Sequence, residues 1–196
     1  MGEEIKKRQK MISFFKRKWE ISCVWLLLLV HVLLCAGFLK SNYLTVDEPI
    51  HITGGLEMLQ NGGYTMNPES GVIPQITAAL GLCGKIEMPP ELTMESMEKS
   101  PYPYARYILF EYGKLAEQDF LLARLVMCIF SVACAFLLWR VARPVGGRAG
   151  ALLMLGIYVF LPLFISNAPL ATADMAATCF FIMTLFAGVR LFRKYS

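Results

Sequence analysis

Acidic side chains at two separate places in the chain are the best candidates for acid–base chemistry. Asp47 and Glu48 are adjacent, and His51 follows Asp47 by four residues, so a helix would place Asp47 and His51 on one face. Such a group can act as a general base, bind a cation or cap the start of a helix. The spacing also permits a pair of metal ligands, but two ligands alone are weak support for a metal. We therefore expect no metal and no other cofactor.

A second carboxylate and one arginine complete the candidate residues. Asp174 lies between two apolar segments, where a carboxylate is costly unless it meets water or a partner. It is either a functional residue or a solvated turn residue that caps the next helix. Arg124 opens another apolar segment, where its guanidinium could hold a phosphate. Its position alone favours a side chain that extends to the lipid headgroups.

Four apolar segments must position these side chains. Hydrophobic residues make up 56% of the chain, above the roughly 45–50% of ordinary soluble domains. The segments cover residues 21–39, 121–141, 149–165 and 175–191. Each is close to the ~20 residues that a helix needs to cross the hydrocarbon core of a membrane. The fold class predicted is an all-α integral membrane protein with four transmembrane helices.

The charges around these segments predict their orientation. Lysine and arginine gather in residues 1–20, around the turn 142–148 and at the C-terminal end, 192–196. The positive-inside rule places these parts in the cytoplasm, so residues 40–120 and 166–174 face outward. The long loop 40–120 holds eleven acidic residues against five Lys or Arg, which agrees with that orientation. We expect a multi-pass protein of the plasma membrane with both termini in the cytoplasm.

The long outer loop contains signals for two short helices. Thr45 and Glu48 have the spacing of a capping box, and a helix to about Gln60 is expected to follow. A second helix is predicted over Ile73–Cys83. Both segments are amphipathic enough to lie along the membrane surface. The basic residues form no patch interleaved with aromatic side chains, so nucleic acid is not expected as a partner.

Several motifs resemble those of a known family. Residues 47–55, Asp-Glu-Pro-Ile-His-Ile-Thr-Gly-Gly, resemble the D-E-x-x-H-x-x-x-G start of the first outer loop in membrane glycosyltransferases of the C superfamily. The likeness is to the family 39-like branch, which contains protein O-mannosyltransferases and the lipid A aminoarabinose transferase. Other segments similar to motifs of that branch follow in the same order: Gly62–Glu69, Ile76–Leu80, Leu122–Leu125, Gly147–Ala151 and Asn167–Asp174. The order and spacing agree over about residues 43–193.

This resemblance implies a reaction and roles for the candidate residues. The donor would be a polyprenyl-phosphate sugar in the lipid bilayer, and the acceptor a protein, lipid or glycan on the outer face. Asp47 would act as the general base, and Asp174 would line the same cavity and orient the acceptor or Asp47. Arg124 would stabilise the lipid phosphate, and Glu48 and His51 would contact substrate.

Members of that family are longer than this chain. They continue with further helices and a C-terminal outer domain, so the resemblance covers the N-terminal portion of the family. The alternative to an enzyme is a non-catalytic membrane subunit or inactive fragment that retains the first half of the fold. In either case a C-terminal partner chain is a further expected partner.

Overall fold

All the regular secondary structure in the described residues is helical. The computed structural model describes residues 2–89 and 100–195, and no strand occurs within them. The elements in chain order are α1 (Gly2–Leu39), α2 (Glu48–Gln60), α3 (Val72–Leu80), α5 (Pro101–Arg106), η1 (Tyr107–Tyr112), η2 (Glu117–Phe120), α6 (Leu121–Phe160), α7 (Pro162–Asn167) and α8 (Asp174–Tyr195). The predicted all-α fold class is confirmed.

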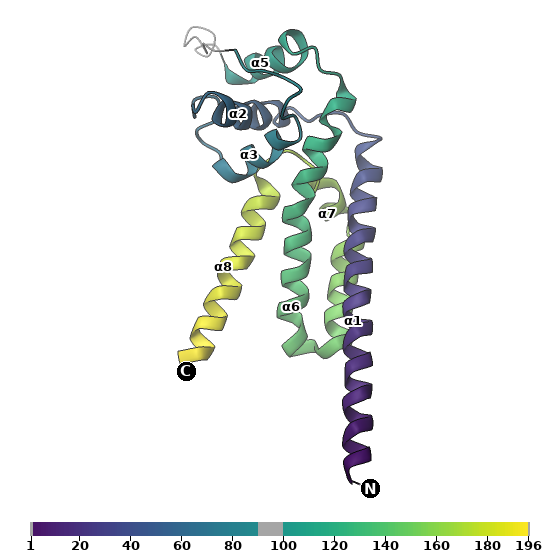
Figure 1. The fold of residues 1–196 in the computed structure, drawn as a ribbon. Coiled ribbons are helices and arrows are strands. Elements are labelled where there is room, and N and C mark those ends of the chain that lie inside the picture. Colours follow the sequence, from purple (N-terminus) through teal and green to yellow (C-terminus); the bar gives the residue numbers. More distant parts are fainter. Residues whose placement is uncertain (1, 90–99, 196) are drawn as a thin grey trace.

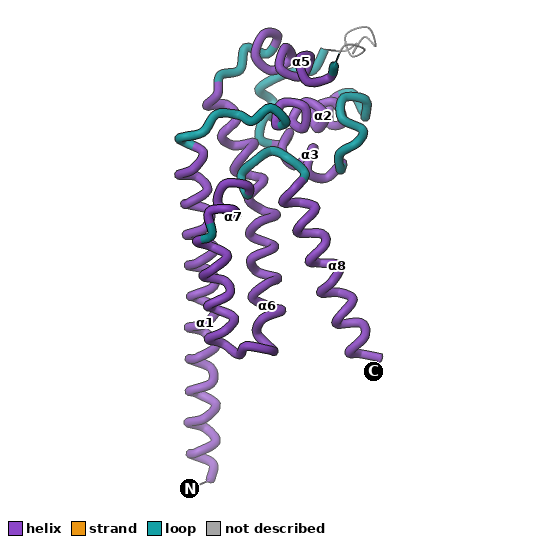
Figure 2. The backbone as a smooth tube through the Cα atoms, turned by 180° about the vertical axis from the view of Figure 1, so that it is seen from behind, coloured by secondary structure: helices purple, strands orange, loops and turns teal. Residues whose placement is uncertain are grey.

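The long and the short helices occupy different ends of the molecule. Helices α1, α6 and α8 extend in one direction, while α2, α3 and α5 gather at one end of them (Figure 1). Both termini lie at the opposite end, and the view from behind shows the same separation (Figure 2). We call residues 42–89 and 100–120 the helical cap.

Helix α6 reverses direction at a glycine. Gly147 has φ 62° and ψ −160°, a left-handed φ that glycine adopts without steric cost. The chain therefore runs away from the cap along the first arm of α6 and returns along the second (Figure 1). The turn predicted at residues 142–148 is thus confined to the neighbourhood of Gly147.

This reversal changes the number of candidate membrane spans. Three helices in the described residues are long and apolar enough to cross a membrane, and they cover Lys18–Leu39, Glu117–Phe160 and Asp174–Phe192. The predicted second and third spans are the two arms of α6. The returning arm ends at Phe160, and from Arg148 it would cover only about 20 Å of the ~30 Å hydrocarbon core. The structure thus gives three candidate membrane-spanning helices, and the second of them, α6, is folded back on itself at Gly147.

A buried carboxylate fastens the reversal to α1. Glu20 on α1 is 1% exposed. Its Oε2 accepts a hydrogen bond from Arg143 Nη2 at 2.8 Å and lies 3.2 Å from Arg148 Nε. These arginines lie on either side of Gly147, so one carboxylate holds both arms of α6 beside α1.

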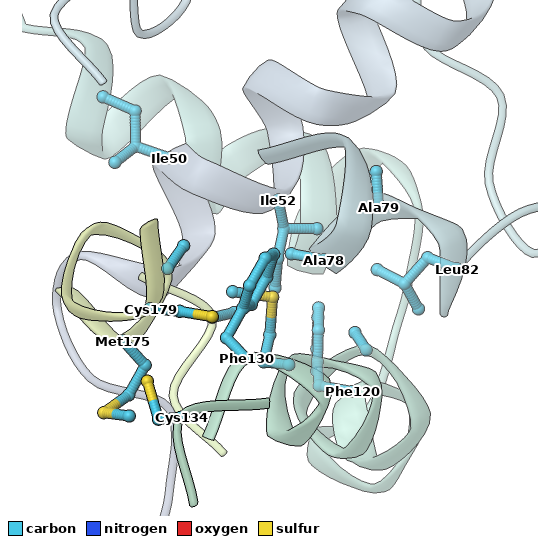
Figure 3. Close-up of a cluster of buried hydrophobic side chains, with 14 of the residues drawn as sticks. Ile50, Ile52, Ala78, Ala79, Leu82, Phe120, Phe130, Cys134, Met175 and Cys179 are labelled. Atoms are coloured by element: carbon cyan, nitrogen blue, oxygen red, sulfur yellow. The ribbon is translucent and has the colours of Figure 1, made fainter. Parts of the chain in front are cut away.

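Glycines allow the cap to pack closely on itself and on α6. A Cβ on Gly55 of α2 would lie 2.0 Å from the carbonyl oxygen of Gln75 in α3, and one on Gly81 would lie 2.2 Å from Ala123 Cα in α6. Side chains of α2, α3, α6 and α8 fill the junction (Figure 3), among them Ile52, Ala78, Ala79, Phe130 and Cys179. The cap is therefore docked on the long helices through a continuous apolar core.

The first cap helix begins later than predicted. Glu48 is its first residue and Asp47 its N-cap, with no capping bond from the Asp47 side chain, so the prediction of Thr45 as N-cap was wrong. One half of the predicted capping box is present, because the Glu48 carboxylate accepts the backbone N–H of Thr45 at 2.7 Å. The end of this helix at Gln60 is confirmed. The second helix, predicted over Ile73–Cys83, is observed as Val72–Leu80, so it ends at Leu80, before the predicted end.

Candidate functional site

The buried carboxylate of Glu48 is the centre of the candidate site. Its side chain is 0% exposed and its Oε1 lies 2.8 Å from Arg124 Nε in an ion pair. The same oxygen accepts the backbone N–H of Ala171 at 3.0 Å, and Oε2 accepts that of Thr45. Three donors from three separate segments thus compensate a charge that would be costly to bury alone.

Arg124 joins the start of α6 to this carboxylate and to the loop after α1. Its Nη1 donates to the carbonyl oxygen of Asn42 at 2.9 Å. Its Nη2 is buried and has no hydrogen-bond partner in the described part of the chain, which is unusual for a buried polar group. Arg124 also lines a pocket of about 350 Å³ between the ends of α1 and α6, together with Lys40 and Glu117. A guanidinium with an unpaired N–H beside a pocket could donate a hydrogen bond to an anionic oxygen there.

Asp47 and Asp174 come from distant parts of the chain, but both lie near His51. Asp47 is the N-cap of α2, and Asp174 is the first residue of α8. Both side chains are exposed. The bond from Ala171 N–H to Glu48 brings the turn before Asp174 against the residue after Asp47. Both carboxylates are therefore exposed to solvent and lie close enough to His51 to influence its pKa.

His51 lies beside both carboxylates. Its side chain is 8% exposed, and its Nδ1 lies 3.4 Å from Asn67 Nδ2, so that the amide donates to the ring. Burial lowers the pKa of His51 below its ordinary value, against the opposing effect of the negative charges of Asp47, Asp174 and Glu48. The imidazole is therefore neutral near pH 7, and Nε2 carries its proton when Nδ1 accepts from Asn67.

The structure divides the predicted site residues into two groups. It places the exposed Asp47 and Asp174 close enough to the buried His51 for both carboxylates to influence its pKa. It places Glu48 and Arg124 against each other in the interior. Among the described residues, no group of three or more His, Cys, Asp or Glu side chains is arranged to hold a metal ion.

The residues that shape the loop after α2 were not predicted from the sequence. Glu57 is 2% exposed and accepts the backbone N–H of Met66 at 2.9 Å and that of Thr65 at 3.0 Å. This places Asn67 beside His51. The sequence signal for this role is weak. Glu57 lies near the end of a helix, before Gly62 and Gly63, and most carboxylates at such positions are solvated and do not bind a loop.

A polar cluster among the long helices was also missed. His31 on α1 contacts Ser131 Oγ through Nε2 at 2.8 Å and the carbonyl oxygen of Val159 through Nδ1 at 3.2 Å. Ser131 Oγ lies 2.8 Å from the Tyr158 hydroxyl. All three side chains are buried, so the cluster links α1 to both arms of α6. The signal available in the sequence was a histidine inside an apolar run.

A comparison with protein families identifies the group to which this architecture belongs. The model of the dolichyl-phosphate-mannose-protein mannosyltransferase family matches residues 99–196, half of the chain. The chain belongs to this family. The predicted resemblance to membrane glycosyltransferases is thereby confirmed, and the mannosyltransferase match includes Arg124 and Asp174. No curated protein and no solved structure matches the chain.

The family match and the candidate site overlap only in part. Asp47, Glu48 and His51 precede the matched residues. They are joined to the matched half by the contacts of Glu48 with Arg124 and Ala171. The site thus connects the half of the chain that matches the family model to Asp47 and Glu48, which lie outside the match.

Proposed function

We propose that the chain takes part in transferring mannose from a polyprenyl-phosphate donor to an acceptor hydroxyl at the outer face of the plasma membrane. The observation that carries the proposal is the meeting of Asp47 and Asp174 beside a buried, neutral His51. Membership of the mannosyltransferase family supplies the class of reaction. The three apolar helices supply the lipid setting in which a polyprenyl donor is dissolved.

The acceptor hydroxyl needs a base at the moment of attack. In this proposal Asp47 takes the hydroxyl proton while the acceptor oxygen bonds to the anomeric carbon of the sugar. The bond from that carbon to the phosphate oxygen breaks on the opposite side, so the anomeric configuration inverts. Asp174 holds the acceptor or Asp47 in place. His51 can donate a hydrogen bond to substrate from Nε2 without adding a positive charge next to the base.

The leaving lipid phosphate gains negative charge during this step. Arg124 Nη2 is the group proposed to stabilise it, because this N–H is buried, unpaired among the described residues, and belongs to a residue that lines the pocket at the end of α1. Fixed donors in a site that excludes water act more strongly than they do in bulk solvent. Lys40 lines the same pocket and adds positive charge at its edge.

The orientation follows from the charges at the far end of the helices. The N-terminal segment carries many Lys and Arg, and both termini lie opposite the cap (Figure 1). With those termini in the cytoplasm, the cap and its acidic residues face outward.

Radiolabel transfer in isolated membranes tests this function. Membranes with and without the chain receive either polyprenyl-phosphate mannose or a nucleotide-linked mannose of equal specific activity. We expect incorporation into protein, lipid or glycan only from the lipid-linked donor, and only when the chain is present. Equal incorporation with and without the chain would refute the enzymatic role and favour a non-catalytic subunit.

A further inference from the structure

The burial of Glu48 separates its role from that of its neighbour Asp47. The Glu48 side chain is 0% exposed, and both of its oxygens already accept donors from the chain itself. Asp47, one residue earlier, is exposed. A substrate could reach Asp47 but would have to displace an ion pair and two backbone hydrogen bonds to reach Glu48.

The backbone N–H groups that Glu48 binds belong to the segments that precede Asp47 and Asp174. Thr45 lies in the loop that leads into Asp47, and Ala171 lies in the turn that leads into Asp174. Arg124 fixes the carboxylate to α6 and, through Asn42, fixes the loop after α1. One side chain therefore touches the segments on both sides of the site.

We propose that Glu48 is a positioning residue that sets the separation of Asp47 and Asp174 by tying the loop before α2 to the turn before α8. This inference rests on the proposed function, which gives those two carboxylates their roles. Errors of about 1 Å in the placement of catalytic groups cost about 100-fold in rate. The hydrogen bond from Ala171 N–H to Glu48 joins α2 directly to the turn before α8.

Glu48→Gln is the informative substitution because it preserves the size of the side chain. Every partner of the Glu48 carboxylate is a donor. A glutamine must therefore aim its own NH₂ group at one of these N–H groups, which leaves that contact broken. Glu48→Asp keeps the charge but shortens the reach by one methylene.

Glu57→Gln is the matched control. Glu57 is on the same helix, is also buried, and also accepts backbone N–H bonds. Its partners, Thr65 and Met66, lie in the loop after α2 and not in the turn before α8. A general weakening of the cap would affect both variants, whereas a lost connection to the turn before α8 would affect only Glu48→Gln.

Two measurements on the full chain in membranes test the proposal. The first is transfer kinetics, for which we expect Glu48→Gln to lower kcat about 100-fold with little change in the KM for the donor. The second is cross-linking between Val46→Cys and Thr172→Cys with a short bis-maleimide, in a background whose exposed Cys83 is replaced by serine. We expect Glu48→Gln to reduce the cross-linked yield several-fold, while Glu57→Gln and Asp47→Asn leave it unchanged.

The cross-linking result is independent of activity, so it separates this inference from the proposed function. If no variant or wild type transfers sugar but Glu48→Gln still loses the cross-link, the positioning role stands and the proposed function fails. An unchanged cross-link in Glu48→Gln would overturn the positioning role. So would a raised donor KM with unchanged kcat, since that pattern belongs to a residue that binds substrate.

Discussion

Two buried carboxylates, Glu48 and Glu20, pair with arginines of α6 at opposite ends of the molecule, but in different surroundings. At the cap, the Glu48 and Arg124 side chains are 0% and 5% exposed. At the Gly147 reversal, the Glu20 side chain is 2% exposed, but Arg143 and Arg148 are 37% and 38% exposed. Only the pair in the cap removes both charges from water.

The difference shows what each pair contributes. A fully buried ion pair adds little net stability, yet removing one partner is costly because the other charge stays buried. Glu48 therefore fixes the positions of the segments that it contacts, and substitution of either Glu48 or Arg124 should destabilise the cap. The arginines near Gly147 keep much of their hydration, so they fasten α6 to α1 with a smaller energetic consequence. The fully buried pair, Glu48 and Arg124, lies where the proposed chemistry needs side chains in fixed positions.

The largest effect is expected from Arg124→Gln. This change leaves Glu48 buried without its cation, which should lower the free energy of unfolding by about 3–5 kcal/mol. Equilibrium unfolding in mixed detergent micelles measures this loss. Arg140→Gln, an exposed arginine on the same helix, is the control and should change stability by about 0.5 kcal/mol or less. Similar losses of unfolding free energy for the two variants would contradict the expected difference between a buried and an exposed arginine.

The docking of the cap on α6 is tested by Gly81→Ala. The added Cβ would lie 2.2 Å from Ala123 Cα, and such overpacking against backbone typically costs about 1–3 kcal/mol. Gly37→Ala is the matched control, because its Cβ would meet nothing within 4 Å. Limited proteolysis of the cap, alongside unfolding, should show faster cleavage only for Gly81→Ala. Unaltered cleavage of this variant would mean that the cap is not packed closely there.

A smaller effect is expected at the other carboxylate. Arg143→Gln removes one partner of Glu20 and leaves Arg148, whose Nε lies 3.2 Å from Oε2. Because these arginines are partly hydrated, we expect a loss of about 1 kcal/mol or less in the same unfolding measurement. A loss as large as that of Arg124→Gln would remove the distinction between the two pairs.

The smallest effect is a pH dependence from His51. Its pKa is lowered in the folded chain, so just below pH 6.5 the unfolded chain binds a proton that the folded chain does not. Stability contributed by the neutral imidazole is therefore present above that range and is lost as the pH falls through it. Unfolding curves between pH 5 and 7.5 should show this slope in the wild type and a flatter one in His51→Gln. An identical slope in the wild type and in His51→Gln would mean that other titratable groups cause the pH dependence.

Local features of the fold were accessible from the sequence. The end of α2 at Gln60 and the helix over Val72–Leu80 follow from turn residues and amphipathic spacing. Helices α5 and η1 were not predicted, because a proline- and tyrosine-rich segment has weak helical propensity and depends on packing against α2. A turn at residues 142–148 was predicted from the apolar segments and the arginines on either side, and helix on both sides of Gly147 makes the reversal tighter than expected.

The candidate site was predicted in part. Asp47, Asp174 and His51 were found from residue type and position, and the structure brings them together. The pairing of Glu48 with Arg124 was not predicted, since their contact across the fold leaves no local pattern in the sequence. Both had been expected to bind substrate, and for Arg124 the unpaired Nη2 keeps that role as part of the proposal.

The most direct measurement of the central claim is mannose transfer by Asp47→Asn in membranes supplied with polyprenyl-phosphate mannose. Asp119→Asn serves as the control, because its carboxylate is already held by Lys85 and by the backbone N–H of Ala116, and Asp119 does not line the pocket beside Arg124. If Asp47 is the general base, its variant should lose about 100- to 10,000-fold in kcat, while Asp119→Asn keeps near wild-type turnover. Transfer by Asp47→Asn at the wild-type rate would contradict the account.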